Sequence, residues 1–280
     1  MPTRYGRTVL ERARSFDAVA GLYDELRPRY PDGLYDDLLT RSGAPQRPEV
    51  LEIGTGPGVA TRPLAERGCR IVGLEPGPNL AAAARANLAG FGDVEIREST
   101  FEAAELVPAS FDLVVSASAW HWVDPQVGPD KAATVLRPGG SLGLWWGHGS
   151  LTDPDVLADL RSVHERLAPE IAATRYAGPP LDEGDRIDDW HGRRRRTEVA
   201  GALADHPAFE SVGAFPHPFE ATYDARQFVR LLDTYSDYRV LDEAVRDQLF
   251  DELVRVIDER HDGRVTRRYS PTLFLARRRG

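Results

Sequence analysis

Two acidic residues frame a loop with three glycines at alternate positions. The stretch VLEIGTGPGVA (50–60) places Glu52 two residues before the first of them, and the glycines are Gly54, Gly56 and Gly58. Glycine lets a ligand approach the backbone closely. At the mouth of this loop, the carboxylate of Glu52 repels a pyrophosphate and attracts an ammonium group. Glu75 ends the next apolar run, where a carboxylate can accept both ribose hydroxyls. The pattern indicates a nucleoside that carries a positive group.

The phosphate-binding alternatives fit this loop less well. A dinucleotide fingerprint needs a third glycine at position 59, where the chain has Val59. A nucleotide phosphate loop needs Gly-Lys-Ser/Thr at the start of the helix, and none is present. Two simpler explanations stay open: the loop is a plain strand-to-helix turn, and Glu75 is a solvated strand end.

The elements around the loop are typical of a parallel sheet covered by helices. Short apolar runs alternate with helical patterns from residue 49 to 146. We expect strands at 49–53, 70–75, 94–99, 111–118 and 141–146. We expect helices from Pro57 to Glu66, after the N-cap residue Asn79, and over 125–136.

The remainder of the chain has a different pattern. Residues 148–208 are polar, with helical patterns and no convincing strand, which predicts a helical insertion or lid. We expect single strands at 211–223 and 265–278, with helices near 224–236 and 241–260 between them. The expected organisation is a helical cap (1–40), a cofactor-binding core (41–147), the insertion (148–208) and a C-terminal completion of the sheet (209–280).

Composition limits the classes of function. The 280 residues carry a net charge of −9, which argues against a nucleic-acid-binding surface. One cysteine excludes an intrachain disulfide, and the histidines show no metal-ligand spacing, so we predict no metal site. The start of the chain has no apolar signal core, and no apolar run is long enough to span a bilayer. We therefore expect a cytoplasmic protein with no membrane partner; the oligomeric state is open.

These motifs resemble the class I S-adenosylmethionine-dependent methyltransferases. The resemblance rests on Glu52-x-Gly54-x-Gly56-x-Gly58 with Glu75, and continues in FDLVVSASAWHWVD (111–124) and LRPGGSLGLWW (136–146). The segment FDAVAGLYDELRPRYP (16–31) is similar to the cap of the small-molecule branch, and AWHW (119–122) resembles trans-aconitate-methyltransferase-like proteins. The resemblance implies an α/β, Rossmann-like, seven-stranded and mostly parallel sheet, with helices on both faces and an antiparallel last strand.

The resemblance also implies the site residues. The expected cofactor-binding set is Glu52, Gly54, Thr55, Gly56, Gly58, Glu75, Pro76, Thr100, Phe101, Ser116, Ala117, Tyr23 and Arg27. The expected substrate-binding set is Tyr30, Trp120, His121, Trp122 and Trp146. The chain departs from the family where Gly-Asp-Ala-Glu is common after the third strand, because it has Ser99–Glu102 there. An acidic contact to the adenine is therefore in doubt, with Phe101 and Thr100 as replacements.

His121 is the candidate catalytic residue. It can act as a general base for a hydroxyl or amine acceptor, or it can orient a carboxylate acceptor that needs no base. The flanking Trp120 and Trp122 can stabilise a sulfonium or line a dry pocket, and packing under a lid is the simpler role for one of them. Arg27 can hold a carboxylate of the cofactor or of the substrate, or can lie on the surface.

Three functions remain. The first is O- or N-methylation of a small molecule, such as a carboxylate or a natural-product hydroxyl, with S-adenosylmethionine as the donor. The second is an NAD(P)-dependent oxidoreductase, which Glu52 and Val59 disfavour. The third is a protein that binds the nucleoside without catalysis, because methyl transfer requires no obligatory catalytic residue.

Overall fold

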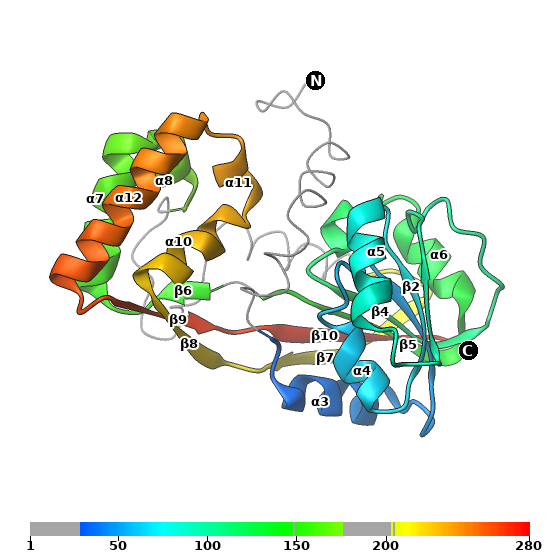
Figure 1. Ribbon diagram of the computed structural model, residues 1–280. Coiled ribbons are helices and arrows are strands. Elements are labelled where there is room, and N and C mark those ends of the chain that lie inside the picture. The colour runs from blue at the N-terminus through cyan, green and yellow to red at the C-terminus, as the bar shows by residue number, and fades with distance from the viewer. Residues whose placement is uncertain (1–28, 148, 176–202, 204) are drawn as a thin grey trace.

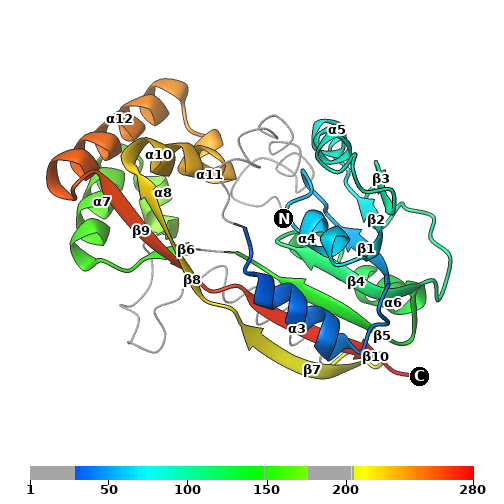
Figure 2. The ribbon, with the colours of Figure 1, turned by 60° about the horizontal axis from the view of Figure 1, so that its bottom comes forward.

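The computed structural model describes residues 29–147, 149–175, 203 and 205–280. Within these ranges the chain forms a seven-stranded sheet and a three-stranded sheet. Figures 1 and 2 show the small sheet and its helices as a second unit beside the large sheet. Of the expected cap, the helix α3 (Asp32–Ser42) is described.

The large sheet has the order β3-β2-β1-β4-β5-β10-β7. Its strands are β1 (Glu49–Ile53), β2 (Arg70–Leu74), β3 (Val94–Arg97), β4 (Phe111–Ala117), β5 (Leu136–Trp145), β7 (Phe209–Pro216) and β10 (Thr272–Arg278). The first five pair in parallel, whereas β10 runs antiparallel to both β5 and β7. The expected Rossmann-like sheet, mostly parallel with an antiparallel last strand, is confirmed.

Helices cover both faces of this sheet because its strands are apolar on both sides. Val50 and Leu113 pack in one cluster with residues of α3 and α4 (Thr61–Glu66), while Leu51 and Val114 pack in another with residues of α6 (Gly128–Val135). Ala81 and Ala84 of α5 (Pro78–Asn87) pack against Ile96 of β3. Parallel strands end at one edge, so this arrangement carries the ends of β1, β2 and β4 to a common place.

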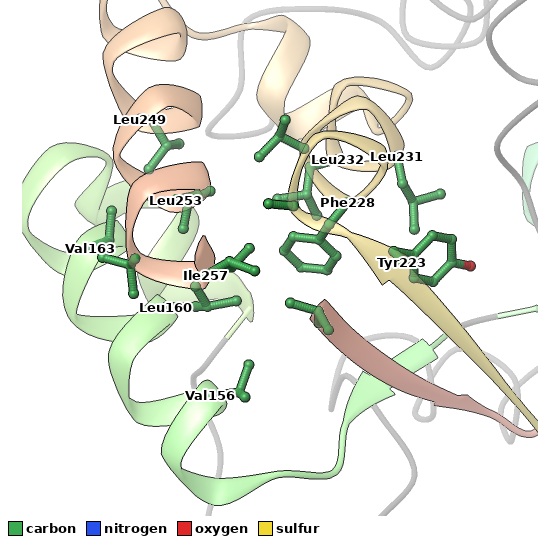
Figure 3. Packing of buried hydrophobic residues seen from close by; sticks show 14 of the residues in the cluster. Val156, Leu160, Val163, Tyr223, Phe228, Leu231, Leu232, Leu249, Leu253 and Ile257 are labelled. Carbon is green, nitrogen blue, oxygen red and sulfur yellow. The ribbon is translucent and has the colours of Figure 1, made fainter. Parts of the chain in front are cut away.

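The second unit has its own hydrophobic core. The small sheet has the order β6-β9-β8, with β6 (Gly149–Leu151), β8 (Phe219–Asp224) and β9 (Arg264–Tyr269). Its helices are α7 (Pro154–Leu167), α8 (Pro169–Arg175), α10 (Ala225–Asp233), α11 (Ser236–Arg239) and α12 (Glu243–Arg260). Leu160, Phe228 and Leu253 meet in its centre, from α7, α10 and α12 (Figure 3). Aspartates cap the starts of α7, α10 and α12, which fixes where these helices begin.

The prediction of single strands at 211–223 and 265–278 is wrong. Each segment divides into two strands that belong to different sheets: β7 and β8, and β9 and β10. The divisions coincide with Pro218 and Pro271, which have no N–H for a continuous ladder. At this point the backbone N–H of His217 donates to the carbonyl of Pro271 at 2.8 Å. Figure 1 shows the two pairs as one antiparallel ribbon that passes from the large sheet to the small one.

The segment 148–208 also differs from the expectation of helices without a strand. Its first part includes β6, whose three residues pair antiparallel with β9. A three-residue strand is too short for a periodic signal. Residues 149–175 share a hydrophobic core with residues 219–269, so the segment expected to complete the sheet divides between two sheets. Of the helices described in the structure, none is both long and apolar enough to cross a membrane.

Candidate functional site

The loop after β1 contains two turns that require glycine. Gly54 has φ +73°, and a Cβ there would lie 2.3 Å from the Cβ of Ala119, which follows β4. Gly56 has φ +57°, and a Cβ there would meet nothing within 4 Å. Both backbones lie in the left-handed region that favours glycine. The loop is therefore closed at Gly54 by the neighbouring strand and open at Gly56, where a ligand can approach the backbone.

Glu52 is fully buried at the carboxyl end of β1. Its Oε2 accepts a 2.6 Å hydrogen bond from the hydroxyl of Thr61 on α4, which follows the loop. Its Oε1 has no hydrogen-bond partner within the described part of the chain. Burial, with a smaller contribution from the Glu75 charge and opposed by the Thr61 hydrogen bond, raises the pKa of Glu52 to about 8. A buried carboxylate with an unpaired oxygen attracts a cation.

Glu75 fixes the shape of the loop. Its Oε2 accepts the backbone N–H of Gly56 at 2.8 Å, and its Oε1 accepts that of Gly77 at 2.9 Å. The carboxylate at the end of β2 therefore joins the glycine loop to the start of α5. Pro76 beside it is exposed. The spacing of Glu75 from the glycines thus has a direct structural effect, because its side chain accepts a backbone N–H of the loop.

A cavity opens between the glycine loop and the second unit. The loop side consists of Glu52, Gly54, Thr55, Gly56, Pro57, Val59 and Ala60. Ala117 and Gly147 line it at the ends of β4 and β5, and three aromatic residues complete it: Tyr30, Phe219 and Tyr269. The hydroxyl of Tyr30 is 3.0 Å from Oγ of Ser118. A concave site that combines aromatic rings with a buried carboxylate suits a small ligand.

His121 lies in the short helix η1 (Trp120–Trp122) and is not among the residues that line this cavity. Its Nδ1 is 3.3 Å from Nε1 of Trp146, and the Trp122 ring centroid is 4.6 Å from that of His121. An indole N–H only donates, so Nδ1 is the acceptor. Trp120 and Trp146 are almost wholly buried. The structure thus brings the expected aromatic residues together, beneath the ends of β4 and β5.

Other expected site residues pack or form hydrogen bonds near the ends of the strands. Phe101 is buried, with its ring 6.2 Å from that of Trp120 and 5.4 Å from Nζ of Lys131. Thr100 accepts the backbone N–H of Ala103 at 3.2 Å. Ser116 donates to the carbonyl of Ile53 at 2.9 Å, which joins β4 to β1.

Other expected site residues have a different role or lie outside the described part of the chain. A Cβ on Gly58, which has φ +96°, would lie 2.9 Å from Leu88, so this glycine serves helix packing. Tyr23 and Arg27 lie outside the described residues. Among the residues that the structure describes, no group of His, Cys, Asp and Glu side chains is arranged to hold a metal ion.

Six lining residues are absent from the expected site: Pro57, Val59, Ala60 and Gly147, which are close in sequence to expected residues, and the two aromatic residues Phe219 and Tyr269. Phe219 and Tyr269 lie on β8 and β9, far from the glycine loop in sequence, and face each other across that strand pair. Their rings stack with a centroid distance of 5.0 Å and an interplanar angle of 12°. No local pattern marks them, because they reach the cavity only through the ribbon that crosses between the sheets.

Comparisons with known proteins agree with this geometry. Residues 51–144 match the family model described as a methyltransferase domain. An uncharacterized methyltransferase of Mycobacterium tuberculosis (strain ATCC 25618 / H37Rv) is 39% identical over 132 residues, which cover 47% of this chain and 51% of that protein. The ubiquinone biosynthesis O-methyltransferase of Methylobacterium sp. (strain 4-46) is 36% identical over 198 residues, or 69% of this chain and 72% of that protein.

A solved structure shows the same fold. The putative type II methyltransferase from Anaeromyxobacter dehalogenans has a TM-score of 0.61 at 24% identity, covering 90% of this chain and 97% of that one. This chain spans about half the length of the curated mycobacterial relatives it matches, 51% in each. The matched domain contains the buried carboxylate and the glycine loop at its start. The chain belongs to the class I S-adenosylmethionine-dependent methyltransferase family.

Proposed function

We propose that this protein transfers the methyl group of S-adenosylmethionine to a small-molecule acceptor. The observation that carries the proposal is Oε1 of Glu52, a buried carboxylate oxygen that lacks a partner in the described chain and belongs to a residue lining the cavity. A cation in that cavity compensates the cost of burying the charge. The cofactor carries two positive groups, an ammonium and a sulfonium, and no phosphate.

The proposed placement follows the loop. The ammonium group of the cofactor lies against Glu52, its backbone contact is at Gly56, where space is open, and its ribose hydroxyls reach Glu75. The adenine then extends toward Thr100 and Phe101, beyond the end of β3. Arg27 is a further proposed partner for the cofactor carboxylate, at a position outside the described residues. Together these contacts hold the cofactor with its sulfonium toward the aromatic side of the cavity.

The chain's own contribution to the reaction is orientation and exclusion of water. S-adenosylmethionine supplies an activated methyl group on a sulfonium. The glycine loop holds one reactant, the rings of Tyr30, Phe219 and Tyr269 bound the space for the other, and the two must be collinear for in-line displacement. A site of this kind needs no group that bonds covalently to the substrate.

The acceptor decides the proposed role of His121. A carboxylate acceptor, as in the trans-aconitate-methyltransferase-like proteins that AWHW resembles, needs no base. A hydroxyl or amine acceptor needs to lose a proton, and the imidazole is then the proposed base. Its Nδ1 already accepts the Trp146 N–H, so proton uptake at that atom breaks this contact. The contact favours a positioning role for His121.

Calorimetric titration with S-adenosylhomocysteine tests the proposal, with NAD(H) and NADP(H) as competing ligands. We expect micromolar binding of the nucleoside and none of the dinucleotides. Glu75→Ala is expected to weaken binding about fivefold or more, since each lost hydrogen bond contributes about 1 kcal/mol. Glu95→Ala, an exposed carboxylate on β3, is the matched control. Preferential dinucleotide binding supports the oxidoreductase alternative, and nucleoside binding without methylation of any acceptor supports a non-catalytic role.

A further inference from the structure

The two sides of the cavity come from different parts of the fold. The glycine loop belongs to the large sheet, whereas Phe219 and Tyr269 belong to the small sheet. If the loop side holds the cofactor, the stacked rings face the space left for the acceptor. This inference rests on the proposed function.

Two glycines between β5 and β6 make room for the cavity's aromatic rings. Gly149 is the cross-strand neighbour of Tyr269, and a Cβ on it would lie 2.4 Å from Cε1 of that ring. A Cβ on Gly147 would lie 2.9 Å from Cε1 of Tyr30. Neither glycine has a positive φ, so space alone and not backbone conformation requires glycine here. The position of the Tyr269 ring therefore depends on the missing side chain at Gly149.

Tyr269 is held rigidly from within the second unit. Its hydroxyl is 2.8 Å from that of Tyr223, and the guanidinium carbon of Arg267 lies 5.4 Å from its ring centroid. Arg267 in turn donates to the hydroxyl of Tyr235 at 2.9 Å and to the carbonyl of Gly149. Burial raises the pKa of Tyr269 well above its ordinary value, so its hydroxyl stays protonated. The residue presents a fixed ring and no base.

The described part of the cavity lining shows which charges an acceptor would meet there. Of the described residues that line it, Glu52 carries the acid, and none is an arginine or lysine. A carboxylate or phosphate in the acceptor space lacks a cationic partner among those residues. A flat aromatic acceptor instead gains stacking energy against the half-buried ring of Phe219, which Tyr269 supports from behind as an almost wholly buried ring.

We propose that the stacked pair of Phe219 and Tyr269 is the acceptor-facing wall of the site, and that it selects acceptors whose methylated hydroxyl is on an uncharged aromatic ring. In the reaction the hydroxyl oxygen bonds to the methyl carbon while the carbon–sulfur bond breaks. The products are an aryl methyl ether, S-adenosylhomocysteine and a proton, which passes to solvent and not to His121, because that imidazole accepts the Trp146 N–H and does not line the cavity. A phenol has a pKa of about 10, far below that of an aliphatic alcohol, so it loses its proton more readily in a site where Tyr269 stays protonated and offers no base.

The test compares two probes of equal size on the complex with S-adenosylhomocysteine. Catechol has an aromatic face, and trans-1,2-cyclohexanediol has the same two hydroxyls without one; trans-aconitate represents an anionic acceptor. Their dissociation constants are measured by saturation-transfer NMR titration. We expect catechol to bind about two- to tenfold more tightly than the diol, the range of an aromatic contact. Equal binding of the two, or tighter binding of trans-aconitate, overturns the inference.

Variants locate the effect at the wall. Phe219→Leu and Gly149→Ala are expected to remove the preference for catechol while the affinity for S-adenosylhomocysteine stays unchanged. Gly92→Ala, at a position with open space around it, is the matched control. A preference that survives in Phe219→Leu, a variant that only trims a half-buried side chain, also overturns the inference. If the unaltered protein does not bind S-adenosylhomocysteine, the proposed function is refuted instead, so the two failures are distinguishable.

Discussion

Replacement of Glu52 by glutamine distinguishes the folding stability that the buried carboxyl costs from the cofactor affinity that it contributes. Its pKa is raised from the ordinary value of 4.5 to about 8, mainly by burial. Between these two pH values the unfolded chain is ionised at this position and the folded chain is not, so the folded protein binds more protons and loses stability as the pH rises. The slope is about 1.4 kcal/mol for each pH unit, and the loss approaches about 5 kcal/mol above pH 8. Glutamine has no charge in either state, so Glu52→Gln removes this dependence.

The assay is urea unfolding of both proteins at pH 5 and pH 8. The amide changes the free energy of unfolding by the same amount at both pH values, because its N–H₂ takes the place of an oxygen that lacks a partner. The informative quantity is therefore the change in the free energy of unfolding between pH 5 and pH 8. We expect the wild-type protein to lose on the order of 3 kcal/mol more than Glu52→Gln over this interval. Glu49→Gln, a half-buried carboxylate at the other end of β1 that pairs with Arg70, is the matched control.

Cofactor binding is expected to strengthen as the pH rises, whereas the folding stability falls. At pH 7 the free carboxyl is mostly protonated, and an ammonium group beside it favours ionisation, so binding of S-adenosylhomocysteine releases about 0.9 proton. Calorimetry in buffers of different ionisation enthalpy measures this number. Glu52→Gln is expected to release none and to bind about tenfold or more weakly, since a hydrogen bond to a charged group contributes about 1.5–3 kcal/mol. An unaltered affinity together with wild-type pH dependence refutes the reasoning about Glu52.

Three further predictions concern the framework of the site. Gly54→Ala brings a methyl group to 2.3 Å from the Cβ of Ala119 at a residue with positive φ. We expect urea unfolding to show a loss of about 2 kcal/mol or more in folding stability, and titration to show weaker binding of S-adenosylhomocysteine. Gly90→Ala, at a position in open space, is the control. Leu253→Ala empties a fully buried position in the second core and is expected to cost about 2–5 kcal/mol in the same assay, and a neutral result contradicts the packing described. Tyr269→Phe keeps the ring but loses a buried hydroxyl contact, so we expect a stability loss of about 1 kcal/mol and an unchanged preference for catechol.

Local patterns predicted the loop well because its residues are close in sequence. Glu52 and the glycines follow one strand directly, and Glu75 ends the adjacent strand, so the fold alone brings them to one edge. The parallel pairing of the first five strands follows from the alternation of strands and helices, whereas their order in the sheet was not predicted. The contact between Glu75 and the N–H of Gly56 is the structural result of that spacing.

The acceptor side required information that the sequence does not carry locally. Nothing near Phe219 or Tyr269 shows that β8 and β9 leave the large sheet, or that they pair with each other beside the cavity. The aromatic AWHW segment pointed to a substrate pocket, yet Trp120 packs in the core, because a short motif does not reveal which face of an element is buried. Pro218 and Pro271 lie where the long segments divide, but a proline by itself does not show that the next strand joins a different sheet, because that depends on a partner strand far along the chain.

A crystal structure of the complex with S-adenosylhomocysteine tests the central claim most directly, through the distance from the cofactor's amino nitrogen to Oε1 of Glu52. The account predicts direct or water-mediated contact there, with the ribose hydroxyls at Glu75 and the sulfur directed toward Tyr30 and the Phe219–Tyr269 stack. A cofactor bound elsewhere, or bound with its amino group away from Glu52, contradicts it.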